Sequence, residues 1–355
     1  MLLIQHLLTP LGWIYAGLIR FRLWLYATGL KSPSRLRKPV ICVGNLTMGG
    51  TGKTPCVIVI GRLLQEQGYR VSVILRGYKG RHHGPPLLVS NGTSLLATSE
   101  QAGDEALLIA KNLPEAVVAV SKDRKSCGDW VENNFPVDVH LLDDGYQHLP
   151  LFRNFNLLLL DVTNPFGGGF PPMGRLREPL SGIKRADAIL LTRTKLGESY
   201  DSLIQELRRH RKDLPLFYSR QKIYSVDSLP GDATLEPVQF RDTRLLAFAG
   251  IGNPSQFFSL LKESQFCILQ TCAFPDHHRY TSRDVSTLKS LSKKIKSHGM
   301  ITTEKDAQNL SLNDFPDHKV WVAKLEFELE DPVTLLDFML RKLGTKISPD
   351  RMIEP

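Results

Sequence analysis

Short apolar runs alternate with amphipathic segments through most of this chain. The runs lie at 40–43, 71–75, 116–120, 137–142, 157–160 and 188–191. Continuous apolar runs predict strands that are buried on both faces, and the segments between them, with apolar residues at helical spacing, predict crossover helices. The pattern therefore predicts an α/β fold with a mostly parallel sheet and helices on both faces.

A polar stretch at 221–243, with one glycine and two prolines, interrupts this pattern. A smaller α/β unit then begins at the apolar run 245–249, and its later elements are expected near 255–262, 282–296, 319–323 and 332–343. We therefore predict three parts, which are an N-terminal helical segment at 1–36, a larger sheet domain at 37–222 and a smaller domain at 223–355.

The first 30 residues are strongly apolar and contain no acid. Their positive charges follow the apolar run, whereas a secretory signal carries them before it, so we expect no cleavage. A proline and two glycines interrupt the uncharged part, and its length is near the lower limit for a spanning helix, which leaves spanning and surface binding both open. Arg20, Arg22 and Trp24 favour contact with lipid headgroups over the alternative, a helix packed on the protein's own core.

Charge is distributed unevenly along the 355 residues. The net charge is +9, yet no Asp or Glu precedes Glu66, and eight of the nine excess charges lie before that residue. The near-neutral remainder argues against nucleic-acid binding and points instead to an anionic membrane surface near the N-terminus. The five cysteines form no CxxC pair, which indicates a reducing, cytoplasmic compartment without a zinc site or disulfide framework.

The stretch 40–55, VICVGNLTMGGTGKTP, combines a strand, a glycine-rich turn and the start of a helix. Such a turn binds phosphates through converging backbone N–H groups, with Lys53 near the β- and γ-phosphates and the Thr54 hydroxyl on Mg²⁺. Thr47 stands where the generic pattern has its first glycine. The predicted cofactor-binding residues are Thr47, Gly49, Gly50, Thr51, Gly52, Lys53 and Thr54.

An acid pair follows the predicted strand 137–142. Phosphoryl transfer requires a metal-holding carboxylate beyond the phosphate loop, and Asp143 and Asp144 occupy the expected place at the end of a neighbouring apolar strand. The alternative is a pair of acids that caps a helix. We therefore predict Thr54, Asp143 and Asp144 as Mg²⁺ ligands.

Further polar residues follow the predicted strands, where ligands of parallel sheets bind. They are Asn45, Arg76, Asp104 and Arg124. Arg175, Arg177 and Glu178 belong to a long loop rich in glycine and proline, which we expect to bind a nucleotide or a substrate anion. Asp104 and Glu105 have a simpler alternative role at a helix start, as complements of the helix dipole. His277, beside an acid in the second unit, is a candidate general base or orienting partner rather than a zinc ligand.

Seven motifs occur together in one order and spacing. They are GNLTMGGTGKTP at 44–55, RGY at 76–78, GDE at 103–105, DDGYQH at 143–148, GRLREP at 174–179, FPDHH at 274–278 and TTEKD at 302–306. With the apolar N-terminus, they closely resemble the tetraacyldisaccharide 4'-kinase family, the lipid A 4'-kinases of Gram-negative bacteria. The resemblance covers nearly the whole chain, and the joint presence of DDGYQH and FPDHH is its most specific part.

This resemblance implies a P-loop NTPase-like fold in which the smaller domain closes over the active-site cleft. It implies transfer of the ATP γ-phosphate, with Mg²⁺, to the 4'-hydroxyl of a tetraacylated glucosamine disaccharide on the cytoplasmic face of the inner membrane, held there by the N-terminal segment. In the family, an acid matching Asp104 and a histidine matching His277 form the catalytic dyad. Gln147 and His148, from DDGYQH, join the residues expected to contact the substrate or the transition state.

Two other classes of protein remain alternatives. A membrane-associated ATPase switch of the ParA/MinD type also carries a GG-x-GKT loop, but its signature lysine precedes the two glycines, where this chain has Met48. A nucleic-acid-binding NTPase would carry basic residues across its nucleotide domain. This chain does not, so we expect no nucleic-acid partner.

Overall fold

A computed structural model describes residues 2–344 except 79, 83, 196, 230–232, 277, 308, 311–313, 316 and 317, and it omits the side chains of residues 2–11. The chain divides into two units, the first comprising residues 1–220 and 329–355 and the second residues 221–328. The sequence placed all of 223–355 in the second domain. Residues 329–355 instead belong to the first unit, because helix α10 (Pro332–Lys342) packs against α2 (Lys53–Glu66).

The sheet of the first unit runs in the order β8-β7-β6-β1-β5-β2-β4-β3. Its strands are β1 (Val40–Asn45), β2 (Val71–Leu75), β3 (Leu87–Asn91), β4 (Val117–Val120), β5 (Val139–Asp143), β6 (Phe155–Asp161), β7 (Ala188–Thr192) and the start of β8 (Leu216–Ser228). All neighbours pair in parallel except β3, which is antiparallel to β4. Every residue of β1 is buried, since β5 and β6 flank it and helices cover both faces.

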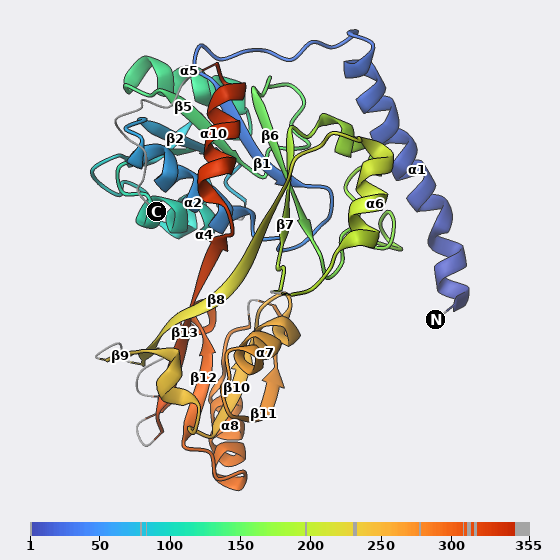
Figure 1. Cartoon of the computed structure of the whole chain (residues 1–355). Coiled ribbons are helices and arrows are strands. Elements are labelled where there is room, and N and C mark those ends of the chain that lie inside the picture. The colour runs from blue at the N-terminus through green and yellow to red at the C-terminus, as the bar shows by residue number, and fades with distance from the viewer. Residues whose placement is uncertain are drawn as a thin grey trace. The chain divides into compact units, whose positions relative to one another are not determined.

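Helices cover both faces of this sheet (Figure 1). Besides α2 and α10, they are α3 (Ser99–Ala102), α4 (Asp104–Asn112), α5 (Arg124–Asn134), α6 (Asp201–His210) and the 3₁₀ helix η1 (Leu180–Arg185). Apolar side chains of α5, α6 and η1 share one core with Val40 and Cys42 of β1. Because side chains alternate along a strand, Ile41 and Val43 face the opposite layer, where α2 contacts α4 and α10.

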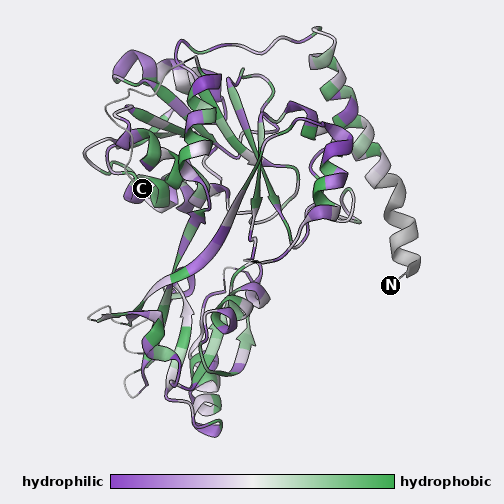
Figure 2. Ribbon diagram, viewed as in Figure 1, coloured by the Kyte–Doolittle hydropathy of each residue, from purple (hydrophilic) through white to green (hydrophobic). Residues whose placement is uncertain are grey.

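Helix α1 (Leu2–Ala27) precedes β1. Its buried residue Ala16 and the half-buried Tyr15 face the first unit, where the Tyr15 hydroxyl donates a hydrogen bond of 3.1 Å to the carbonyl oxygen of Arg177. Figure 2 shows apolar and polar residues mixed along the part of α1 that is coloured. Among the described helices, none combines the length and the hydropathy needed to cross a bilayer.

The strands of the second unit run in the order β11-β10-β12-β13-β8, with β9 paired to β8. Its elements are β9 (Thr234–Leu235), η2 (Pro237–Phe240), β10 (Leu245–Ala249), α7 (Pro254–Glu263), β11 (Ile268–Ala273), α8 (Ser282–Lys294), β12 (Gly299–Thr303), α9 (Glu304–Ala307) and β13 (Val320–Leu329). Buried Asp306 accepts hydrogen bonds from the Gly250 N–H at 2.8 Å, the Tyr280 hydroxyl at 2.9 Å and the Thr303 hydroxyl at 2.7 Å. These bonds fix the loops at one end of this sheet.

The predicted α/β class and mostly parallel sheet are confirmed, and one local prediction was wrong. The stretch 221–243, interpreted as a polar break, contains most of β8, whose exposed face gives it a polar composition. Gly103, with a φ of +89°, separates α3 from α4. This break makes Asp104 the first residue of α4.

Candidate active site

The phosphate loop connects the buried end of β1 to α2. Gly52 precedes the helix with a φ of +86°, a left-handed conformation that glycine adopts without strain. None of the amides of residues 49–52 meets a hydrogen-bond acceptor among the residues that the structure describes. The Thr51 hydroxyl is buried and also lacks a partner there. Unpaired donors at a helix N-terminus fit an anionic ligand such as a phosphate chain.

The glycine- and proline-rich loop at 167–179 lies directly against the phosphate loop. The Met48 N–H donates to the Arg175 carbonyl at 2.6 Å, and the Arg177 N–H donates to the Leu46 carbonyl at 2.7 Å. Thr47 and Leu176 form an antiparallel bridge between these two bonds. The sequence predicted a functional loop here, and the structure gives it a specific task, since it braces the backbone of the phosphate loop.

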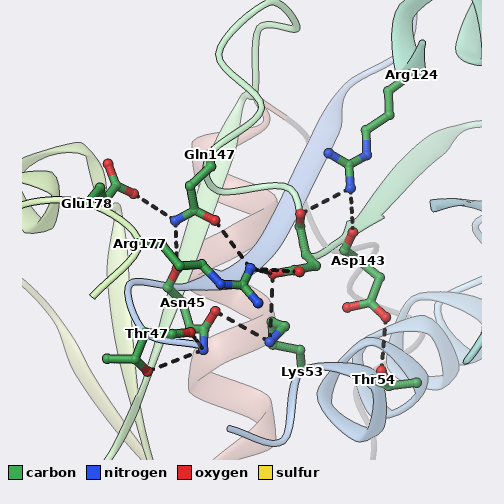
Figure 3. Close-up of polar contacts among 10 residues, drawn as sticks. Asn45, Thr47, Lys53, Thr54, Arg124, Asp143, Gln147, Arg177 and Glu178 are labelled. Atoms are coloured by element: carbon green, nitrogen blue, oxygen red, sulfur yellow. Dashed lines mark hydrogen bonds and ion pairs between the residues drawn. The ribbon is translucent and has the colours of Figure 1, made fainter. Parts of the chain in front are cut away.

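Lys53 lies between an amide and a carboxylate (Figure 3). Its Nζ donates to Asn45 Oδ1 at 3.3 Å and is 3.7 Å from Asp144 Oδ1. The Asn45 side chain in turn donates to the Thr47 carbonyl at 2.7 Å. This chain of contacts orients the ammonium group at the start of α2, where it can meet the phosphates of a bound nucleotide.

Asp143, the last residue of β5, is buried, and its two oxygens differ. Oδ2 accepts a hydrogen bond of 3.0 Å from the Thr54 hydroxyl, while Oδ1 has no partner among the described residues. Burial raises the pKa of Asp143 to about 7, and the charge of Glu105 acts in the same direction. An unpaired carboxylate oxygen beside a helix-start threonine fits a divalent cation, which would keep the acid ionised.

Asp144, in contrast to Asp143, is kept ionised by its neighbours. Burial alone would raise its pKa, but Lys53 and Arg177 together hold the pKa below its ordinary value. Arg177 Nη1 donates to both Asp144 oxygens, at 2.6 and 2.7 Å. The buried Arg124 donates through Nη2 to the carbonyl oxygens of Asp143 and Asp144, at 3.1 and 3.0 Å. Asp144 is therefore a fixed anion, and Asp143 is the acid with an available oxygen.

A second polar chain supports the loop at 167–179. Gln147 Nε2 donates to the Asn45 carbonyl and to Glu178 Oε1, both at 2.8 Å. Glu178 is buried and also accepts a hydrogen bond from Arg185. Gln147 thus links the end of β1 to the loop that carries Arg177.

The remaining predicted residues lie outside this hydrogen-bonded network. Arg175 packs its guanidinium against Gly49, Arg76 is exposed, and Asp104 is exposed at the start of α4. His148 is half-buried, and burial together with the charge of Arg124 lowers its pKa to about 4. His277 lies outside the described residues, so its role remains a prediction.

The predicted site omitted three residues that the structure brings to it. Glu105 acts on the pKa of Asp143, although its place at a helix start suggested only a dipole complement. Arg193 and Asp161 form an ion pair at the ends of β7 and β6, and Arg193 reaches the phosphate loop. The sequence offered one signal for this pair, which is that each residue follows a predicted strand. Many other polar residues share that position, so the signal did not identify these two.

Comparisons with known proteins agree along the whole chain. A family model described as tetraacyldisaccharide-1-P 4'-kinase matches residues 4–344. The tetraacyldisaccharide 4'-kinase of Pelobacter propionicus is 39% identical over 345 residues, which are 96% of this chain and 92% of that protein. The protein of the same name from Geobacter metallireducens is 36% identical over 334 residues, which are 94% of this chain and 96% of that protein.

A solved structure shares this architecture. The crystal structure of LpxK from Aquifex aeolicus in complex with ATP aligns with a TM-score of 0.72 at 30% sequence identity. The alignment covers 96% of this chain and 99% of that one. Both units therefore belong to the shared fold.

We expect Asp143→Asn to stabilise the metal-free protein at neutral and higher pH. The folded pKa of Asp143 is near 7 and the unfolded value near 4, so the wild type should lose up to about 1.4 kcal/mol of stability per unit as pH rises between them. The variant should lack this slope in thermal unfolding with chelator, and Mg²⁺ should stabilise only the wild type. Asp144→Asn is the matched control, which should lose stability because it leaves Lys53 and Arg177 without their anion. A wild-type profile as flat as that of Asp143→Asn would contradict the interpretation.

Proposed function

This chain belongs to the tetraacyldisaccharide-1-P 4'-kinase family, and on that premise we propose that it transfers the γ-phosphate of ATP to the 4'-hydroxyl of a tetraacylated glucosamine disaccharide 1-phosphate. This transfer is a step of lipid A biosynthesis. The observation that carries the proposal is the family match over residues 4–344, which includes the phosphate loop and the whole second unit.

The chain's own residues divide the work of such a transfer. Lys53 is oriented by Asn45 and Asp144 so that its charge acts on the transferring phosphate. Asp143 and Thr54 would hold Mg²⁺, which supplies positive charge at the phosphate oxygens when it is bound. The braced loop at 167–179 keeps these groups in place, so little reorganisation is needed during the reaction.

The alternative of a ParA/MinD-type ATPase switch is not favoured. The family match extends far beyond the phosphate loop, and Met48 stands where that class has its signature lysine. A nucleic-acid-binding NTPase is disfavoured by the near-neutral charge after Glu66. A kinase also differs from a switch in its behaviour, because it should turn over ATP only with the acceptor present.

We also propose that Asp104 and His277 act as the acid–base pair that activates the sugar hydroxyl. A hydroxyl is a weak nucleophile, and a positioned base removes its proton as the phosphate bond forms. Asp104 is exposed at the start of α4, available to a substrate. The two residues belong to different units, so catalysis by the pair requires both units to contribute to one turnover.

We also propose that helix α1 binds the cytoplasmic leaflet of the inner membrane, and its exposed side chains support this. Trp13, Ile14, Leu18, Phe21 and Trp24 are all exposed. At 100° per residue they fall within an arc of about 140° on one side of the helix. Arg20 and Arg22 project at the two edges of this arc, and both are exposed. An apolar face flanked by arginines favours a helix that lies in the membrane interface.

A pocket beside α1 supports contact with part of a lipid substrate. The pocket has a volume of about 530 Å³ and is lined by Gly12, Trp13, Ala16, Arg20, Phe170 and Met173. Its walls are mainly apolar and include one cation, a combination that suits acyl chains and an anionic headgroup. Phe170 and Met173 belong to the loop that braces the phosphate loop, so the pocket and the candidate site share that loop.

Lys53→Ala should lower kcat/KM about a hundredfold, since removal of a charge that stabilises the transition state costs about 3 kcal/mol. The measurement is phosphate transfer from labelled ATP to the tetraacylated disaccharide by the purified full chain. Lys111→Ala, which removes an exposed lysine in the last turn of α4, should match the wild type. Equal turnover by Lys53→Ala and the wild type would refute the phosphate-loop assignment, and rapid lipid-independent ATP hydrolysis would favour a switch.

Asp104→Ala and His277→Ala should each lower kcat by about 10² to 10⁴, the usual cost of losing a general base. The double variant should be little worse than the poorer single variant, because partners in one proton transfer are not additive. The measurement is a double-mutant cycle on kcat at saturating substrates. If kcat of the double variant falls by the product of the two single-variant factors, the two residues act independently.

The double variant Leu18→Ser/Phe21→Ser should bind lipid vesicles about a hundredfold or more weakly than the wild type, because each buried apolar side chain contributes about 1.5 to 3 kcal/mol. Sedimentation with anionic vesicles measures the difference. Val333→Ser removes an exposed apolar side chain from α10 and should have no effect. Replacing Arg20 and Arg22 by Gln should weaken binding only to anionic vesicles and at low salt. Unchanged sedimentation of Leu18→Ser/Phe21→Ser would place the membrane contact elsewhere.

A further inference from the structure

Arg193 connects the end of the sheet to the phosphate loop. It follows the last residue of β7, and its Nη2 donates a hydrogen bond of 2.7 Å to the carbonyl oxygen of Gly50. Its Nη1 forms an ion pair with Asp161, the last residue of β6. One guanidinium therefore bridges a sheet-end carboxylate and the backbone of the loop expected to bind phosphates.

Both ends of this bridge are fixed. Asp161 accepts two hydrogen bonds from Thr163 through Oδ1, from the N–H at 3.0 Å and from the hydroxyl at 2.7 Å, which leaves Oδ2 for Arg193. The Arg193 backbone has a φ of +63°, a left-handed conformation that is strained for any residue with a side chain. A strained residue persists where its surroundings hold it, and such residues concentrate at functional sites.

The contact with Gly50 has a consequence for the next amide. The Gly50 carbonyl and the Thr51 N–H belong to one planar trans peptide, so they point in opposite directions. When Arg193 fixes the carbonyl, it also fixes the Thr51 N–H toward the other side of the loop. The Thr51 hydroxyl is buried and has no partner among the described residues, and the Thr51 N–H likewise meets no acceptor there. A ligand with several anionic oxygens would satisfy both groups.

A second arginine approaches the same part of the loop. Gly49 has a φ of +113°, and a Cβ atom built on it would lie 1.8 Å from Nη2 of Arg175. Arg175 is also close enough to Arg193 for its charge to act on it. Two cations from separate elements thus lie at Gly49 and Gly50, and among the described residues only Arg193 donates to a carbonyl of the glycine pair.

We propose that Arg193 is a positioning residue for nucleotide binding, which holds the Gly50–Thr51 peptide so that the Thr51 N–H faces the phosphates of ATP. The inference rests on the proposed function, because it takes ATP as the ligand of this loop. A simple ion pair that closes the sheet end would explain the contact with Asp161. It would not explain the hydrogen bond to Gly50.

The test compares Arg193→Gly and Arg193→Lys in the full chain. Glycine accepts the left-handed backbone and removes the guanidinium, and lysine keeps the charge but lacks the planar fork that donates to Asp161 and Gly50 from two nitrogens. Lys296→Gly is the matched control, since Lys296 is an exposed residue of the second unit with a φ of +53°. The measurements are the equilibrium Kd for ATP without lipid, the KM for the disaccharide and the thermal unfolding midpoint.

Both Arg193 variants should bind ATP about tenfold more weakly, the loss expected for one hydrogen bond from a charged donor. The KM for the disaccharide should stay within about twofold, and Lys296→Gly should match the wild type in both. Asp161→Asn should weaken ATP binding about threefold, and it should add nothing in the Arg193→Gly background, because its effect acts through Arg193.

Two results would overturn the inference alone. One is an ATP affinity of Arg193→Gly that equals that of the wild type. The other is a variant in which ATP binds more weakly, the KM for the disaccharide rises and the unfolding midpoint falls together, which would mark a purely structural role. Failure of the wild type itself to bind ATP would overturn the proposed function and this inference with it. The two failures are therefore distinguishable in one set of measurements.

Discussion

Two adjacent carboxylates at the end of a buried strand are the constraint on which the rest of the site depends. Removing an acid from water disfavours its ionised form, and a second negative charge beside it adds to the cost. The two acids differ in how their negative charge is compensated. Asp144 receives the charges of Lys53 and Arg177 and stays ionised, whereas Asp143 receives one hydroxyl and has a pKa near neutrality. This inequality leaves one oxygen available for a cation.

The same constraint explains the long loop at 167–179. Arg177 neutralises Asp144 only if its backbone comes close to the phosphate loop, and the hydrogen bond from its N–H to Leu46 provides that approach. Glycines make the approach possible, because a side chain at Gly49 would collide with Arg175. The loop is thus part of the electrostatic balance of the site, in addition to any contact that it makes with substrate.

The sequence predicted those features that follow from burial or from a local motif. Central strands such as β1 and β5 are buried on both faces, so their apolar runs are unambiguous, and the glycine loop and the acid pair are recognisable from short segments. β8 was missed because its exposed face carries polar residues. The role of Arg193 depends on a left-handed backbone and on a contact with a residue 143 positions away, and neither can be inferred from composition or periodicity.

The hydrogen bond from Tyr15 to the carbonyl of Arg177 makes α1 a structural neighbour of the nucleotide site. Arg177 presents its carbonyl to α1, its N–H to the phosphate loop and its guanidinium to Asp144. Movement of the helix would therefore displace a residue that contacts both the phosphate loop and Asp144. On the proposal that α1 lies in the membrane interface, a micelle and a native bilayer would act on this helix differently, and the medium around the protein would become a variable of its chemistry.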